Sequence, residues 1–164
     1  MLEGLGADAV GMNCGLGPEQ MLPIVKRLLE VSSVPVFVKP NAGLPRVENG
    51  KTVYDITPEG FAGWMKQIAE LGVHAVGGCG GTTPAHIREM AAACRGIPVS
   101  YPEKKHRTVV TSYSQAVVIG DGPVVIGERI NPTGKKKYQK ALRENDLDFI
   151  LSQGIEQEKS GADI

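Results

Sequence analysis

The chain has 164 residues, 41% of them hydrophobic, and its 18 basic side chains balance 18 acidic ones. This length is enough to bury one core, and the neutral balance gives no net field toward nucleic acid or an anionic membrane. No apolar run approaches the roughly 20 residues that span a bilayer, the N-terminus lacks a signal-peptide pattern, and three cysteines do not make a disulfide framework. We therefore expect a soluble, cytoplasmic protein that binds neither nucleic acid nor membranes.

A repeated glycine motif predicts a parallel α/β fold. The sequence LGADAVG at 5–11 returns as LGVHAVG at 71–77 and in part as SGADI at 160–164. Each copy is typical of a helix end, a glycine in the left-handed conformation and then a buried strand. Such joins connect successive strand–helix units, so the strands are expected to lie parallel in one sheet.

Four strands and four helices follow from this pattern. The strands are expected at about 8–14, 34–39, 74–79 and 124–130. The helices are predicted to begin at Pro18, Pro58, Pro84 and Asp146, and the last three to end at Gly72, Gly96 and Gly161. Pro23 interrupts the first turns of the first helix, so its start is less well defined.

The predicted fold class is α/β, with parts of two (β/α)8 TIM barrels. Residues 1–96 hold the last strand–helix units of one barrel, and 123–164 hold the first unit of another. The basic, hairpin-like stretch at 97–122 breaks the strand–helix rhythm and is interpreted as an interdomain connector. Since a complete barrel needs roughly 200–250 residues, we interpret the sequence as a fragment whose open sheet edges favour self-association.

Polar side chains stand where the predicted strands end. They are Cys14, Lys39, Asn41, Cys79, Glu128 and Asn131. Because functional residues gather at the carboxyl ends of parallel strands, the thiols of Cys14 and Cys79 can converge, and thiolates suit Zn²⁺. The alternative for each is a small apolar role, which we assign to Cys94 on the apolar face of its helix.

The stretch GGCGGTTP, at 77–84, also permits another interpretation. Glycine amides before a helix N-terminus can hold a phosphate, with no role for the thiol. On spacing alone, this phosphate site is slightly favoured over zinc. The three histidines have no ligand spacing, and the basic runs at 104–107 and 135–137 are assigned to solvated surface.

Longer motifs resemble a known family. GMNCGLGPEQM, VPVFVKPNAGLP and VGGCGGTTPAHI together resemble the homocysteine-binding domain of the cobalamin-dependent methionine synthases and related homocysteine methyltransferases. VVIGERINPTGKKK and SQGIEQEKSGADI are similar to the opening of the pterin-binding domain that follows in that family. The resemblance covers nearly the whole chain, in the family's order.

The resemblance implies a metal site and a substrate residue. In the family three thiolates hold zinc, one at the end of one strand and two adjacent ones at the end of another. Cys14 matches the first and Cys79 the second, while Gly80 stands where the third is expected. Asn41 matches a residue near the bound homocysteine.

The resemblance also implies a reaction. Zinc activates the homocysteine thiol, which is methylated to methionine, and the methyl group comes from methyltetrahydrofolate through cobalamin on a separate corrinoid-binding module. Glu128 and Asn131 match the motif that lines the pterin site. Because glycine cannot coordinate a metal and both barrels are incomplete, we expect the 164-residue chain by itself to be inactive. The alternatives are a non-enzymatic remnant that acts as a binding module, and a phosphate-binding TIM-barrel enzyme.

Overall fold

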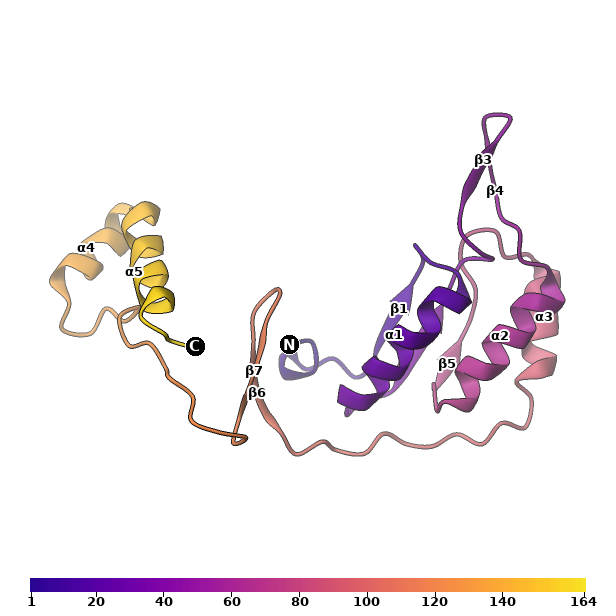
Figure 1. Ribbon diagram of the computed structural model, residues 1–164, viewed down its shortest axis with the longest axis horizontal. Coiled ribbons are helices and arrows are strands. Elements are labelled where there is room, and N and C mark those ends of the chain that lie inside the picture. The colour runs from indigo at the N-terminus through magenta and orange to yellow at the C-terminus, as the bar shows by residue number, and fades with distance from the viewer. The chain divides into compact units, whose positions relative to one another are not determined.

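The computed structural model describes all 164 residues, which form two compact units, Leu2–Lys105 and His106–Ile164 (Figure 1). A parallel sheet with the strand order β1-β2-β5 organises the first unit. Its strands are β1 (Val10–Asn13), β2 (Val36–Lys39) and β5 (Ala75–Val76). The predicted α/β class and the parallel sheet are confirmed, whereas three strands form no closed barrel.

Three helices accompany this sheet, and each begins with a proline in its first turn. They are α1 (Pro18–Val31), α2 (Pro58–Glu70) and α3 (Pro84–Ala93). At the start of α2 the Thr57 hydroxyl accepts the N–H of Gly60, which is the predicted cap. Pro23 is exposed inside α1 and does not end it, because it removes only one backbone hydrogen bond near the helix start.

The core of the first unit lies between the helices and the sheet. The side chains that are almost completely buried include Met21, Val25, Val36, Val38, Phe61, Met65 and Ile68. Val36 and Val38 share one face of β2 because side chains alternate along a strand. Phe61, Met65 and Ile68 share one face of α2 because residues four and three apart align on a helix. The helices therefore support the sheet through this apolar core. The loops that follow the strands start from this supported sheet.

A short hairpin between β2 and α2 was not predicted. Its strands, β3 (Arg46–Glu48) and β4 (Lys51–Val53), pair antiparallel and project from the first unit (Figure 1). Asn49 and Gly50 join them with φ angles of 51° and 74°, and two positive φ values in a two-residue loop are typical of a type I′ turn. The Asn-Gly pair was the local signal for this hairpin.

The second unit contains one hairpin and two helices. Strands β6 (Thr108–Thr111) and β7 (Ala116–Ile119) pair antiparallel, as the hairpin-like pattern indicated. Helix α5 (Leu147–Lys159) begins as predicted, with the Asp146 side chain accepting the N–H of Phe149. Helix α4 (Lys136–Glu144) was missed, because its lysine-rich start was assigned only to solvated surface. None of the chain's helices is both long and apolar enough to cross a bilayer.

The strand predicted at 124–130 is wrong. No strand forms there, and the only bonds between its backbone and another backbone segment are to the end of the chain, where the N–H of Asp163 donates to the carbonyl of Val125 at 2.8 Å and the N–H of Gly127 donates to that of Ile164 at 2.6 Å. A strand needs a longer ladder of hydrogen bonds with a neighbour. The only sheet of the second unit is the antiparallel pair β6–β7, and no parallel strands form there.

The first unit should depend on the ring of Phe61, which is 0% exposed. Replacing Phe61 by Ala is expected to lower the free energy of unfolding by about 3–5 kcal/mol, because the ring leaves a cavity. Tyr101→Ala is the control, since Tyr101 is 86% exposed and such surface changes stay within about 0.5 kcal/mol. Urea unfolding followed by the fluorescence of Trp64, the single tryptophan, measures both. Equal effects of the two changes would contradict this account of the core.

Candidate thiol site

Cys14 and Cys79 lie at the same edge of the sheet. The N–H of Cys14 donates to the carbonyl of Lys39 at 3.0 Å, and the N–H of Cys79 donates to the carbonyl of Pro40 at 2.9 Å. The two cysteines thus flank the end of β2, because parallel strands in register end together. The convergence expected from the sequence is present.

Asn41 connects the loops that carry the two cysteines. It is only 2% exposed, and its side-chain oxygen accepts the N–H of Gly80 at 2.9 Å. Its backbone N–H donates to the carbonyl of Leu16, in the loop after β1, at 2.9 Å. A buried amide must keep its partners, so Asn41 holds both loops in a fixed relation.

The thiol of Cys14 is exposed and its pKa is lowered. The largest cause is a hydrogen bond from the thiol of Cys79, followed by the backbone N–H of Gly15, and the side chain of Asn41 and the N–H of Gly80 add to it. Partial desolvation opposes these effects. Each donor stabilises the thiolate more than the thiol, so Cys14 is prepared to act as an anionic sulfur donor.

The backbone of Cys14 is unusual. Its φ angle is 65°, in the left-handed region that residues other than glycine seldom adopt. Such conformations are found preferentially at functional sites, where the surrounding structure imposes them. Here the bond from Cys14 to Lys39 and the bond from Leu16 N–H to the carbonyl of Cys14, at 2.9 Å, hold the turn. The strain fits a residue placed for its sulfur rather than for packing.

A side chain at position 80 would have no free space. A Cβ built on Gly80 would lie 2.5 Å from the hydroxyl oxygen of Tyr54 and 3.0 Å from Oδ1 of Asn41. The ring of Tyr54 also covers Gly81, whose φ of +77° requires glycine. A phenol therefore stands where the family resemblance expects a third thiolate. Sequence reasoning missed Tyr54, because no local pattern relates the residue after β4 to the distant loop before α3.

The phosphate interpretation of the glycine-rich loop has little support in its hydrogen bonds. Backbone N–H groups that already donate to protein acceptors belong to Gly77, Cys79, Gly80, Thr82 and Thr83. An anion cradle needs several free amides directed at one point. The loop instead uses its amides to fix its own conformation and that of Cys79.

The remaining candidate ligands lie elsewhere. Cys94 is half-buried beside the core, and burial together with the charge of Glu70 raises its pKa, consistent with its predicted packing role. His86 is buried in the first turn of α3, where its Nδ1 accepts the N–H of Thr83 and its Nε2 donates to the carbonyl of Ile56. No group of three or more His, Cys, Asp or Glu side chains gathers in the chain.

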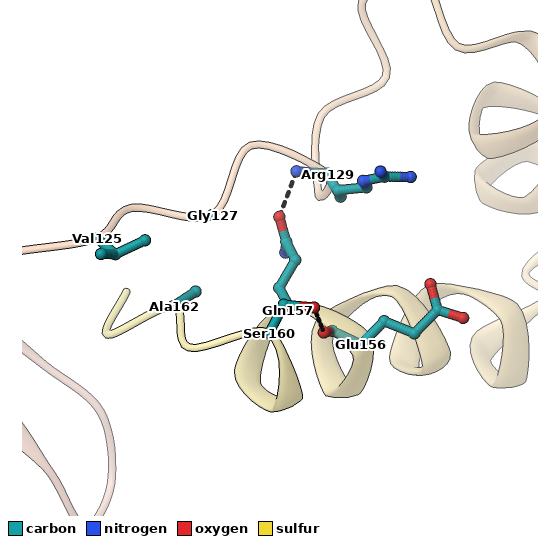
Figure 2. A pocket seen from close by; sticks show the side chains of 7 residues that line it. All are labelled: Val125, Gly127, Arg129, Glu156, Gln157, Ser160 and Ala162. Carbon is teal, nitrogen blue, oxygen red and sulfur yellow. Dashed lines mark hydrogen bonds between the residues drawn. The ribbon is translucent and has the colours of Figure 1, made fainter.

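The two residues predicted for a pterin site lie in the second unit and make local contacts. Glu128 is exposed and pairs with Lys135 at 2.6 Å, while the side-chain oxygen of Asn131 accepts the N–H of Thr133 at 3.0 Å. A hollow of about 290 Å³ lies beside them, and Figure 2 shows Gln157 reaching across it to the backbone N–H of Arg129. Neither Glu128 nor Asn131 lines this hollow.

The opposite pKa shifts of two cysteines lead to a measurable difference in reactivity. After treatment with a chelator, Cys14 should react with iodoacetamide faster than Cys94 at neutral pH, because a lowered pKa leaves more reactive thiolate at a given pH. The rate for Cys14 should also rise at lower pH than that for Cys94. Peptide mass spectrometry over a pH series measures both rates, and faster labelling of Cys94 would refute the assignment.

Comparison with known proteins identifies the family of the chain. Residues 1–94 match the family model described as homocysteine S-methyltransferase. The chain is 37% identical over 169 residues to the methionine synthase of Mycobacterium tuberculosis, covering 99% of this chain and 14% of that protein. It is 37% identical over 174 residues to the methionine synthase of Mycobacterium leprae, with the same shares. The chain thus spans 14% of the length of either relative. It belongs to the homocysteine S-methyltransferase family.

Proposed function

We propose that the first unit supplies the thiol site of an enzyme that methylates homocysteine to methionine, with Cys14 and Cys79 as zinc ligands. The observation that carries this proposal is the convergence of the two cysteines at the end of β2, where the backbone of Cys14 is bound to Lys39 and that of Cys79 to Pro40. The family membership supports the choice of homocysteine as the substrate.

The donor chemistry of the site fits zinc. Two sulfur donors at one sheet edge suit Zn²⁺, which prefers thiolates, and the hydrogen bonds that lower the pKa of Cys14 favour the form that binds metal. When bound, zinc would supply a positive charge that holds a substrate thiol as the nucleophilic thiolate. A reducing compartment such as the cytoplasm, which we propose as the location, would keep the three thiols free.

Asn41 is proposed to contact homocysteine as well as the loops. Its amide is fixed by the N–H of Gly80 and by its own backbone bond to Leu16, so it can orient a polar substrate group without first losing side-chain freedom. Cys14 lies at the exposed side of this arrangement, where a small amino acid can approach from solvent.

The second unit is proposed to begin the pterin-binding barrel, with Glu128 and Asn131 directed at methyltetrahydrofolate. The identity to methionine synthases extends over 99% of the chain and so includes this unit, which supports the proposal. The methyl group would reach homocysteine through cobalamin on a corrinoid-binding module. The outer edges of β1 and β5 have no neighbouring strand, and we propose that such edges allow self-association.

Zinc binding tests the proposed site. The chain should bind about one Zn²⁺, and Cys14→Ser or Cys79→Ser should weaken the affinity at least about tenfold, because each change removes a sulfur donor. Cys94→Ser is the matched control and should bind zinc like the wild type, since Cys94 packs beside the core. Competition with a chromophoric chelator measures the affinities. Absence of zinc binding in the wild type would refute the metal site and favour a non-enzymatic binding module.

The 164-residue chain by itself is expected not to methylate homocysteine. A sheet of three strands encloses no barrel interior, so the substrate is not held in one orientation toward a methyl donor. Incubation with homocysteine, methylcobalamin and zinc, followed by chromatography for methionine, measures this activity. Methionine formed above the protein-free rate would show that three strands suffice.

A further inference from the structure

Tyr54 is fixed against the loop of Cys79 by the backbone on either side of it. Two residues after Tyr54, the N–H of Ile56 donates to the carbonyl of Ala42 at 3.0 Å, and the N–H of Ala42 donates to the carbonyl of Gly80 at 2.8 Å. Before it, the hairpin β3–β4 ends at Val53. Three segments thus lie side by side, and the phenol of Tyr54 is held over the glycines that follow Cys79.

The hydroxyl of Tyr54 stands where the side chain of residue 80 would begin. The hydroxyl oxygen lies 2.5 Å from the Cβ that any residue other than glycine would carry at position 80. The sulfur of a cysteine at this position would be one covalent bond from that Cβ. Tyr54 therefore brings an oxygen atom to the neighbourhood in which a third sulfur donor would lie, and the absence of a side chain at Gly80 makes room for it.

The other polar groups of the site surround the same residue. The N–H of Gly80 hydrogen-bonds to Oδ1 of Asn41, and Oδ1 lies 3.0 Å from the Cβ position that the Tyr54 hydroxyl also approaches. Cys79 directly precedes Gly80, and the backbone N–H of Cys14 is bound to Lys39 at the same end of β2. The two cysteines and the phenol of Tyr54 thus lie around the end of β2.

We propose that the phenol oxygen of Tyr54 is the third protein donor to zinc, in place of the thiolate that Gly80 cannot supply. The inference rests on the proposed function, since it assumes that Cys14 and Cys79 hold the metal. Catalytic zinc sites keep three protein ligands and one position for substrate, and zinc accepts oxygen as well as sulfur and nitrogen donors. With Tyr54 the chain reaches that number and leaves the fourth position for a substrate thiol.

Tyr54→Phe tests the proposal because it removes one oxygen atom and keeps the ring that covers Gly81. Zinc affinity of the full 164-residue chain should fall at least about tenfold, since even the loss of a group that only supports a ligand weakens metal binding roughly 10–100-fold. Tyr101→Phe, at an 86% exposed tyrosine of the same unit, is the matched control and should leave the affinity unchanged. Circular dichroism checks that both variants fold.

A second variant acts on the same contact without removing a donor. In Gly80→Ala the new Cβ would displace the Tyr54 hydroxyl, which is the movable end of a side chain, so the fold should persist while zinc affinity falls. In the Tyr54→Phe background the same change should have a smaller effect, because effects transmitted through one contact are not additive. Zinc should also produce the ultraviolet difference band of a metal-bound phenol in the wild type but not in Tyr54→Phe.

The outcomes separate this inference from the function on which it rests. Loss of affinity and of the phenol band in Tyr54→Phe, together with loss in the Cys14→Ser and Cys79→Ser variants, supports both. If the cysteine variants lose zinc while Tyr54→Phe binds it as tightly as wild type, the third donor is not Tyr54 and the thiol site stands. If the wild-type chain binds no zinc, the proposed metal site and this inference both fail.

Discussion

The buried side chain of Asn41 is the interaction on which the thiol site depends. It accepts the backbone N–H of Gly80, and its own backbone N–H donates to Leu16 in the loop after β1. Leaving such a group without partners in the interior is unfavourable by about 1–3 kcal/mol. The loops after β1, β2 and β5 are therefore coupled. The position of one cysteine relative to the other depends on these bonds of Asn41.

The apolar core gives this network a rigid base. Val36 and Val38 of β2 are buried against the helices, so the central strand cannot shift its register without exposing them. Because β2 is the middle strand, its register fixes where β1 and β5 end, and hence the height of Cys14 and Cys79 along the sheet. Packing on one side of the sheet thus determines chemistry at its edge.

Glycine has two different uses in the loop after β5. Gly81 is needed for its left-handed backbone, whereas Gly80 is needed because Tyr54 occupies the space that a side chain would fill. The second use links the hairpin β3–β4, which ends next to Tyr54, to the thiol site. The hairpin β3–β4 therefore helps to shape the place where a substrate thiol would bind.

The sequence by itself determined four of the five helices, the parallel arrangement of the first unit and the polar residues at the ends of its strands. Prolines and caps at helix starts, glycines at helix ends and apolar residues with helical spacing are local signals, and Thr57 and Asp146 cap as their positions predict. The longer motifs also sufficed to indicate the family. The missed helix α4 shows the limit of this reasoning, since two buried residues, Tyr138 and Ala141, outweigh its polar composition.

Only the tertiary structure decided how distant segments meet. The segment 124–130 has the composition of a strand, but a strand exists only where a neighbour completes its hydrogen bonds, and too few partners are available to it. The same holds for Tyr54, whose role depends on a contact with Gly80 across the fold. Pairing and packing between residues far apart in the chain are set by the summed geometry of all the elements, and no local pattern carries that information.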